Sequence, residues 1–336
     1  MDLLVKEQLD WIASEQNQMK SLLVALSEEN SGSLYIEGIQ KCFTTFDQAC
    51  DSLESDNKRV MLPKWGTYNE LGEKSSHEMG EILVYAKRLD APVKVLLSGH
   101  MDTVFPPSSS FQKTSEEQGV LKGPGVADMK GGLIIMLKAL EAFERFEGKN
   151  TLGWQFVISP DEEIGSPGSA KLLSKWASDF DVGCIAEPAL PGGELAKTRK
   201  GSLNFSVFIK GKSAHVGRCF DEGRSAIVAI ARLIQLLDEG NKMEGLTVNT
   251  GKILGGEARN VVPPSASCQV NVRFGKESSE KSLRDWIDLQ LKKVEEETGC
   301  LCRLENWLMR PAKPLTSQIE SMFEGFQQCA SELGMP

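Results

Sequence analysis

The sequence lacks any apolar run long enough to span a bilayer, for which about 20 residues are needed. Residues 1–10 read MDLLVKEQLD, so the basic n-region and long apolar core of a signal peptide are also missing. Basic residues are not in excess, because 38 basic against 47 acidic side chains give a net charge of -9. This balance argues against non-specific nucleic-acid binding. We therefore expect neither a membrane span nor a nucleic-acid partner.

Paired CxxC motifs are absent as well, although the sequence has eight cysteines. Scattered cysteines without such pairs are typical of reduced thiols, so we expect a cytoplasmic protein. A chain of 336 residues exceeds what one ordinary core serves, and two domains are expected. The balance of 40% hydrophobic and 25% charged residues is that of a normal globular protein.

One stretch organises the sequence. It opens with VKVLL at 93–97, an apolar run that predicts a buried strand. His100 and Asp102 follow directly, and a glycine-rich turn then carries Asp128 into an apolar helix at 133–143. Ligands of an open α/β sheet bind beyond the carboxyl ends of its strands, so we expect these polar side chains at one rim.

Two later stretches repeat this pattern. Strands predicted at 154–159 and 182–186 are followed by the pair Glu162-Glu163 and by Glu187. One imidazole and several carboxylates at one rim suit a borderline divalent metal such as zinc. Without a cation, carboxylates packed together would repel one another. The sequence therefore predicts a metal site.

Apolar periodicity predicts the remaining elements of the first domain. They are one or two helices at 4–26, a helix at 39–53, strands at 60–62 and 82–86, and an exposed loop at 72–80. We expect an α/β fold with a mixed sheet. No internal repeat or low-complexity tract is visible.

After the PGG sequence at 191–193 the pattern changes to β-α-β-β-α-β, which predicts a small ferredoxin-like domain inserted into the first one. Its elements are predicted at 203–209, 225–238, 246–254, 267–274, 278–298 and 301–308. An amphipathic helix at 317–333 is expected to return to the first domain. We thus predict a catalytic metal-binding domain of residues 1–195 and 309–336 and an inserted domain of residues 196–308.

Several motifs in fixed order resemble the two-zinc metallopeptidase and deacylase family, which includes glutamate carboxypeptidase, acetylornithine deacetylase, succinyl-diaminopimelate desuccinylase and aminoacylase. The motifs are HMD at 100–102, GVADMKGG at 125–132, DEE at 161–163, EP at 187–188, GKSAHVG at 211–217 and GGEARNVVP at 255–263. Together they cover nearly the whole chain. The GPGVAD sequence at 123–128 and the RPA sequence at 310–312 resemble the glutamate carboxypeptidase branch most.

The resemblance implies two zinc ions, with cobalt or manganese as alternatives. His100 and Glu187 would bind one ion, Asp128 would bridge both, and Glu163 would bind the other. The alternative is that these residues are surface polar groups after strands. The Asp128–Met129 peptide would be cis, as in the family.

Two further roles follow from the same resemblance. Glu162 would be the general base that takes a proton from the metal-bridging water and returns it to the leaving amine. Asp102 would hold His100 through its other ring nitrogen. Two adjacent glutamates suit this division, because one is tied to metal and its neighbour is left free.

In the inserted domain, His215 resembles a residue that stabilises the tetrahedral oxyanion, in several dimeric relatives from the partner subunit. Asn260 and Arg273 resemble groups that hold the substrate, and a guanidinium can grip a carboxylate with two parallel hydrogen bonds. Two alternatives stay open: a capping or core role for His215 and a solvated strand-end charge for Arg273. A homodimer through the inserted domain is expected.

The family has one more zinc-binding histidine near its C-terminus, beyond a glycine-rich segment. The sequence contains only His77, His100 and His215, and none of them matches it. The second zinc would keep Asp128 and Glu163, fewer than the three protein ligands usual for catalytic zinc. We therefore expect the 336-residue form to be impaired or inactive and a longer form to be the enzyme.

The resemblance implies a zinc-dependent hydrolase that cleaves an amide bond next to a free carboxylate. Its substrate would be a small peptide or an N-acyl amino acid, which makes it a carboxypeptidase or a deacylase. One alternative is an acetylornithine deacetylase-like or succinyl-diaminopimelate desuccinylase-like deacylase. Another, from a different class, is a non-catalytic truncated homologue that acts as a binding or dimerisation protein. Metal content separates the last reading from the other two.

Overall fold

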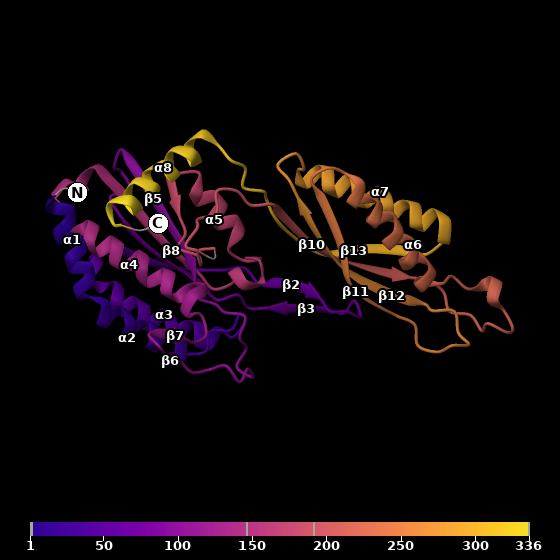
Figure 1. Cartoon of the computed structure of the whole chain (residues 1–336). Helices are drawn as coiled ribbons and strands as arrows, with labels where there is room; N and C mark the ends of the chain where they lie inside the picture. Colours follow the sequence, from indigo (N-terminus) through magenta and orange to yellow (C-terminus); the bar gives the residue numbers. More distant parts are fainter. Residues whose placement is uncertain (1–2, 146, 191, 335–336) are drawn as a thin grey trace. The chain divides into compact units, whose positions relative to one another are not determined.

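The computed structural model describes residues 3–145, 147–190 and 192–334. Its chain forms two compact units (Figure 1). The first comprises residues 1–65 and 77–194, and the second comprises residues 66–76 and 195–336. The boundary after residue 194 lies beside the one predicted after residue 195. Among the described residues, no helix has both the length and the apolar character that crossing a membrane requires.

The first unit is built on a five-stranded sheet with the order β1-β4-β8-β5-β9. Its strands are β1 (Asp56–Met61), β4 (Glu81–Lys87), β5 (Val93–His100), β8 (Leu152–Ser159) and β9 (Val182–Cys184). The strands β8, β5 and β9 are parallel, whereas β1 and β4 are antiparallel additions, so the predicted mixed sheet is confirmed. Because the parallel strands end at the same edge, the loops that follow them meet there.

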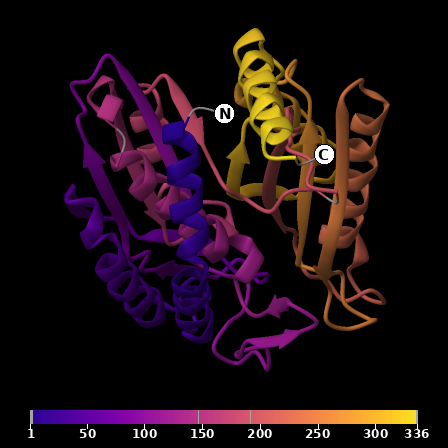
Figure 2. The same ribbon diagram turned by 60° about the vertical axis from the view of Figure 1, so that its left-hand side comes forward.

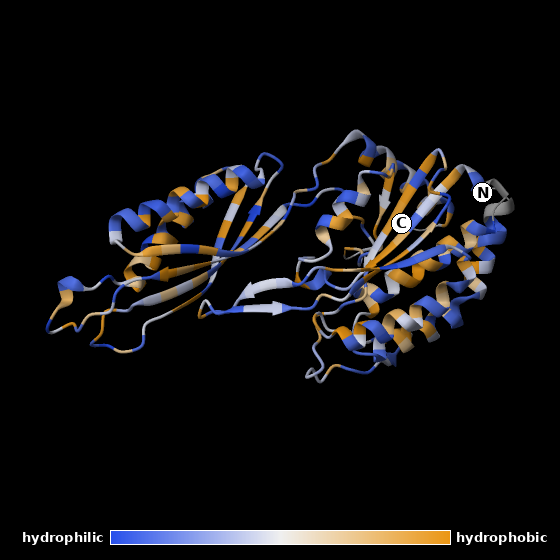
Figure 3. Cartoon of the chain, turned by 180° about the vertical axis from the view of Figure 1, so that it is seen from behind, coloured by the Kyte–Doolittle hydropathy of each residue, from blue (hydrophilic) through white to orange (hydrophobic). Residues whose placement is uncertain are grey.

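Helices cover both faces of this sheet. They are α1 (Leu3–Ser14), α2 (Gln16–Glu28), α3 (Ile36–Cys50), α4 (Gly131–Glu144) and α5 (Ala170–Ala177). Side chains of α2, α3 and α4 pack on one face, and those of α5 pack on the other. Figure 3 shows hydrophobic residues gathered in the strands and on the helix sides turned toward them. The central strand β8 is buried on both faces, as expected for a strand between two helix layers.

Glu144, at the end of α4, is a half-buried carboxylate at the edge where β8 begins. It accepts hydrogen bonds from Trp154 Nε1 at 2.8 Å and from Arg88 Nη1 at 3.0 Å, and Lys87 Nζ lies at 3.2 Å. Burial alone would raise its pKa, but the hydrogen bonds from Arg88 and Trp154 outweigh burial and lower the pKa of Glu144 to about 2. The carboxylate therefore stabilises the folded state only while it is ionised.

Glu144→Gln is expected to lower the free energy of unfolding by roughly 2–3 kcal/mol at pH 7. Since the folded pKa lies below the unfolded value, this contribution is complete above the unfolded pKa and is lost as pH falls toward 2. The difference in the free energy of unfolding between the variant and the parent should shrink by about half at pH 3. Urea unfolding at both pH values measures it. Glu117→Gln, at an exposed ion pair with Lys122, is the control and should cost almost nothing.

A cavity of about 400 Å³ lies at the same edge, lined by both acidic and basic side chains, among them Trp11, Lys138 and Glu144. None of the predicted site residues lines it. Its charges largely pair with one another, as Lys138 does with Glu15 and Glu141. We assign it no ligand.

The second unit has the predicted order of elements. They are β10 (Gly201–Lys210), α6 (Ala226–Asp238), β11 (Leu246–Gly255), β12 (Ser265–Phe274), α7 (Glu280–Thr298) and β13 (Leu301–Arg310). The sheet order β11-β12-β10-β13, with every neighbouring pair antiparallel, is that of a ferredoxin-like fold. Both helices lie on one face of this sheet (Figure 2). They pack over the alternating Leu203, Phe205, Val207 and Ile209 of β10.

The other face of this sheet carries a hairpin that the sequence did not predict. The strands β2 (Trp65–Tyr68) and β3 (Lys74–His77) pair with each other, so the loop predicted at 72–80 is wrong. Asn306 binds Tyr68 through both backbone groups, at 2.9 Å each. Arg303 lies over the rings of Tyr68 and Phe208, with centroid distances of 4.5 and 5.0 Å. Residues 66–76 thus belong to the second unit.

A small hairpin and a C-terminal helix lie outside the two sheets described above. The strands β6 (Ser115–Glu117) and β7 (Val120–Lys122) form a second small hairpin. The helix predicted at 317–333 is confirmed as α8 (Ser317–Glu332), whose N-cap Thr316 accepts a hydrogen bond from Ile319 N. No residue of α8 is buried, and it groups with the second unit. The expected return of residues 309–336 to the first domain stays a prediction.

Candidate metal centre and active site

His100 is the last residue of β5 and is 1% exposed. Its Nδ1 lies 3.0 Å from the carbonyl oxygen of Asp102 and 3.4 Å from Asp102 Oδ1. In the neutral imidazole, Nδ1 donates to these oxygens and Nε2 keeps a lone pair, which is the form that can bind a metal. The relation expected between these two residues is thus present.

Asp102 is fully buried and connects two loops. Its Oδ1 accepts a hydrogen bond from Glu162 N at 3.0 Å, and its Oδ2 accepts one from Glu163 N at 3.1 Å. The Ser33 hydroxyl donates to Oδ2 at 2.6 Å. The same carboxylate therefore fixes both His100 and the turn after β8. Ser33 was not predicted, because nothing in its local sequence points to a partner 69 residues away.

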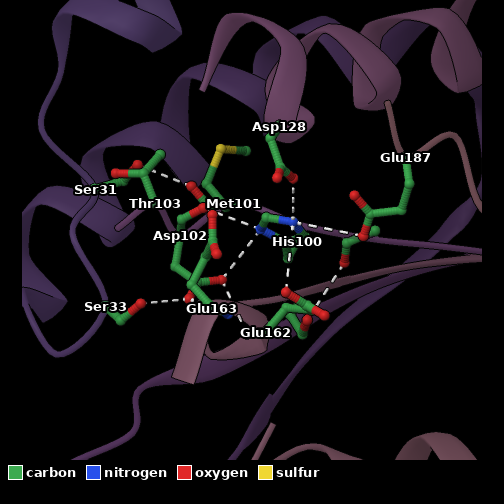
Figure 4. Close-up of polar contacts among 12 residues, drawn as sticks. Ser31, Ser33, His100, Met101, Asp102, Thr103, Asp128, Glu162, Glu163 and Glu187 are labelled. Atoms are coloured by element: carbon green, nitrogen blue, oxygen red, sulfur yellow. Dashed lines mark hydrogen bonds and ion pairs between the residues drawn. The ribbon is translucent and has the colours of Figure 1, made fainter. Parts of the chain in front are cut away.

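Three carboxylates surround the Nε2 side of His100 (Figure 4). The Nε2 atom lies 3.2 Å from Asp128 Oδ1, 3.7 Å from Glu187 Oε1 and 3.9 Å from Glu162 Oε2. One atom each from His100, Asp128 and Glu187 lie within 4.8 Å of one another. The structure thus brings together residues from three separate stretches, as expected.

Backbone packing sets the positions of Asp128 and Glu187. Asp128 lies in a turn at Val126–Lys130 that leads into α4, and its peptide bond to Met129 is cis, as predicted. At Gly132 an added Cβ would lie 2.0 Å from the carbonyl oxygen of Ala186, the residue before Glu187. Only glycine allows the start of α4 to approach this backbone so closely. The two carboxylates therefore converge.

The charges of the cluster are unbalanced. Burial opposes protonation of His100, but hydrogen bonds to Asp102 and Glu187 outweigh it and raise its pKa to about 11. Burial, followed by the charge of Asp128, raises the pKa of Glu163 to about 7. Burial also raises the pKa of Asp128, with Glu187 adding to the effect. The carboxylates therefore repel one another, and a divalent cation would relieve this repulsion.

These residues fit a divalent metal. An imidazole nitrogen and several carboxylate oxygens are suitable ligands for zinc and its neighbours. His100, Asp128 and Glu187 form the candidate metal site. Glu163 lies outside that group of three, although the charge of Asp128 acts on it.

Comparison with known proteins identifies the family. The model of peptidase family M20/M25/M40 matches residues 96–335. The chain belongs to peptidase family M20/M25/M40.

Relatives of the chain carry different names. The chain is 29% identical to succinyl-diaminopimelate desuccinylase of Maricaulis maris, in an alignment that covers 72% of this chain and 67% of the relative. It is 28% identical to carboxypeptidase G2 of Pseudomonas sp., in an alignment that covers 60% of this chain and 48% of the relative. The chain thus spans about half to two thirds of the length of these relatives. The fold resembles an M20 family metallo-carboxypeptidase of Sulfolobus solfataricus, with a TM-score of 0.64, 15% identity and coverage of 85% and 77%.

In the second unit of this M20 chain, His215 and Asn260 lie on neighbouring segments. Val216 N donates to the carbonyl oxygen of Asn260 at 3.1 Å, and His215 forms a β-bridge with Val261. Gly217 N donates to His215 Nδ1 at 3.1 Å, so the ring proton is on Nε2. The exposed His215 is therefore a donor, and the alternative of a core histidine is wrong.

Arg273 lies elsewhere in the same unit. It pairs with Ser202 at one end of β12, whereas Ser265, at the other end, pairs with Lys210. Eight residues of strand separate these positions, roughly 25 Å. His215 follows directly after the Lys210 end. The structure thus keeps Arg273 apart from the His215–Asn260 pair. Arg273 Nε donates to Asn271 Oδ1 at 3.1 Å, and its side chain is exposed.

Proposed function

We propose that the protein is a metal-dependent hydrolase that cleaves an amide bond next to a free carboxylate, as a carboxypeptidase or an N-acyl-amino-acid deacylase. The observation that carries this proposal is the convergence of His100, Asp128 and Glu187, with a third carboxylate, Glu162, 3.9 Å from the imidazole. Membership of the M20 family and the names of the relatives support it.

Two zinc ions are the proposed cofactors, with cobalt or manganese as alternatives. His100 and Glu187 would hold one ion, Asp128 would bridge, and Glu163 would hold the other. When bound, the metals would polarise the scissile carbonyl and lower the pKa of the attacking water.

The chain's own residues perform the proton transfers. Glu162, whose side chain is 46% exposed and faces the cluster, takes a proton from the attacking water and passes it to the leaving nitrogen. Asp102 holds His100 and the turn that carries Glu162, so that base and ligands keep their relative positions. The Nε2 proton of His215 can donate to the developing oxyanion.

A homodimer through the second unit is part of the proposal. Arg273 would bind the substrate carboxylate, and Asn260 would hold the substrate beside His215. Because roughly 25 Å of strand separates Arg273 from His215, the two ends suit different active sites. One copy would supply His215 to its partner's site. Sedimentation equilibrium tests this, and a monomer at micromolar concentration would contradict it.

Within the enzyme class, the alternative is a deacylase acting on N-acetyl or N-succinyl substrates, which the name of the Maricaulis maris relative favours. From another class, the alternative is a metal-poor binding or dimerisation protein. A cytoplasmic location stays a prediction. The free thiols of all eight cysteines are consistent with it.

Metal stoichiometry and a substrate panel test the function. The chain is loaded with zinc, and peptides ending in glutamate are compared with N-acetyl and N-succinyl amino acids. About two cations per chain with hydrolysis of one substrate group would support the enzyme and identify its branch. Metal without hydrolysis would support the expected impairment of the 336-residue form, whereas neither metal nor hydrolysis would contradict the proposed function.

A further inference from the structure

Lys130 is a buried lysine that the proposed reaction does not use. It is 0% exposed and lies two residues after Asp128, at the end of the turn. Its Nζ donates to the carbonyl oxygen of Leu26 at 2.7 Å and to that of Glu29 at 3.3 Å. A fully buried ammonium is costly unless its donors are satisfied, so this position needs an explanation.

The partners of Lys130 explain why a cation is tolerated there. Leu26 lies in the last turn of α2, and Glu29 is its C-cap residue. The last carbonyl groups of a helix have no partner within it, and they form the negative end of the helix dipole. The ammonium therefore closes the end of α2. It also joins α2 to the turn that carries Asp128.

The backbone of the turn is shaped around this lysine. Lys130 N donates to the carbonyl oxygen of Gly125 at 2.8 Å. Gly125 has a φ of 70°, and an added Cβ would lie 3.0 Å from the Cδ of Lys130. A side chain at position 125 would thus be strained and would press on the lysine stem.

The chain that follows α2 is tied to the second ligand loop. Ser31 Oγ donates to the carbonyl oxygen of Met101 at 2.8 Å, and Thr103 N donates to that of Ser31 at 2.9 Å. Ser33 Oγ donates to Asp102 Oδ2 at 2.6 Å (Figure 4). Residues 26–33, here called the α2 clamp, therefore contact the loops of both Asp128 and His100.

We propose that the α2 clamp and Lys130 position Asp128 against His100 and thereby set the affinity of the metal site. Lys130 is then a positioning residue that acts on the metal through Asp128. The clamp lies before residue 96, where the match to the M20 family begins. This inference rests on the proposed metal site. It adds that the α2 clamp, which lies outside the matched region, acts on that site together with Lys130, which lies inside it.

Cobalt binding tests the inference. A titration measures the cobalt Kd, and the visible spectrum of the bound ion reports its coordination geometry. Lys130→Met keeps the apolar stem and removes the ammonium. We expect its cobalt Kd to rise by about 10–100-fold, the usual effect of losing a group that orients metal ligands. The d–d bands should also change, because the coordination geometry is altered. A purely structural role would leave both unchanged in the folded variant.

Lys138→Met is the matched control. Lys138 is also a buried lysine in this unit, at 7% exposed, and pairs with Glu15 and Glu141. Its variant should lose stability but keep the parent's cobalt affinity and spectrum. Ser33→Ala, a milder change in the clamp, should raise the cobalt Kd several-fold and decides the question if Lys130→Met does not fold.

The outcomes separate this inference from the proposed function. Failure of the parent chain to bind cobalt would overturn both. Cobalt binding by the parent, with unchanged affinity in folded Lys130→Met, would overturn the inference alone. Unchanged affinity in Ser33→Ala would do the same where Lys130→Met does not fold. An equal loss of affinity in Lys138→Met would also overturn it, because the effect would then follow general destabilisation.

Discussion

Glu162→Gln is expected to lower the rate of amide hydrolysis by about 10²–10⁴-fold while metal content stays at the level of the parent chain. The amide keeps the size of the glutamate but cannot accept a proton. Glu162 N donates to Asp102, and the turn is held through that backbone bond, which the substitution leaves in place. The variant should therefore fold and bind metal normally.

Glu163→Gln is the matched control for this experiment. The two glutamates are neighbours and both donate a backbone N–H to Asp102. Glu163 is the proposed metal ligand, so its variant should bind metal more weakly than the parent chain. At saturating metal it should still hydrolyse the substrate. Steady-state rates and metal analysis on both variants separate the roles. Loss of metal in Glu162→Gln, or full activity in that variant, would contradict the assignment of Glu162 as the base.

Asp102→Ala is expected to lower both stability and metal affinity. The substitution leaves two partly buried backbone N–H groups, those of Glu162 and Glu163, without their acceptor, and the Ser33 hydroxyl loses its partner. Each unsatisfied donor costs about 1–3 kcal/mol, so we expect a loss of roughly 3 kcal/mol or more. The imidazole of His100 keeps the backbone carbonyl of residue 102 as a partner but loses the carboxylate 3.4 Å from Nδ1, which should weaken metal binding by about 10–100-fold.

Denaturant unfolding and metal titration measure these two effects. Asp102→Asn is the informative comparison, because the amide keeps one acceptor oxygen and the shape of the side chain. It should retain more stability than the alanine variant, yet it should still bind metal more weakly than the parent. Parental metal affinity in folded Asp102→Ala would contradict the role that we assign to Asp102.

The arrangement of the proposed metal site could be predicted because its residues follow strong local signals. His100 ends an apolar strand, and the acidic residues follow two more such strands. Parallel strands share one carboxyl edge, so chain order alone predicts the meeting of these side chains. The cis bond after Asp128 came from the resemblance of its motif, not from any local property of the sequence.

Other features depend on contacts between distant segments and leave no local signal. The strand at Lys74–His77 is polar and short, so it read as a loop, and Asn306 and Arg303 hold the hairpin from the other half of the chain. The burial of Lys130 has no local signal either, since it depends on the end of α2. Periodicity cannot report such pairings.

The hairpin at residues 66–76 makes the second unit discontinuous in sequence. Its material comes from two parts of the chain, so three peptide connections, near residues 65, 76 and 194, join the two units. A single proteolytic cut near residue 194 would therefore sever residues 195–336 from the rest of the chain but leave the hairpin of the second unit covalently attached to the first unit. A recombinant fragment of residues 195–334 would present Phe208 and Arg303 without Tyr68, and dissection of this protein should carry residues 66–76 along, supplied in trans or grafted by circular permutation.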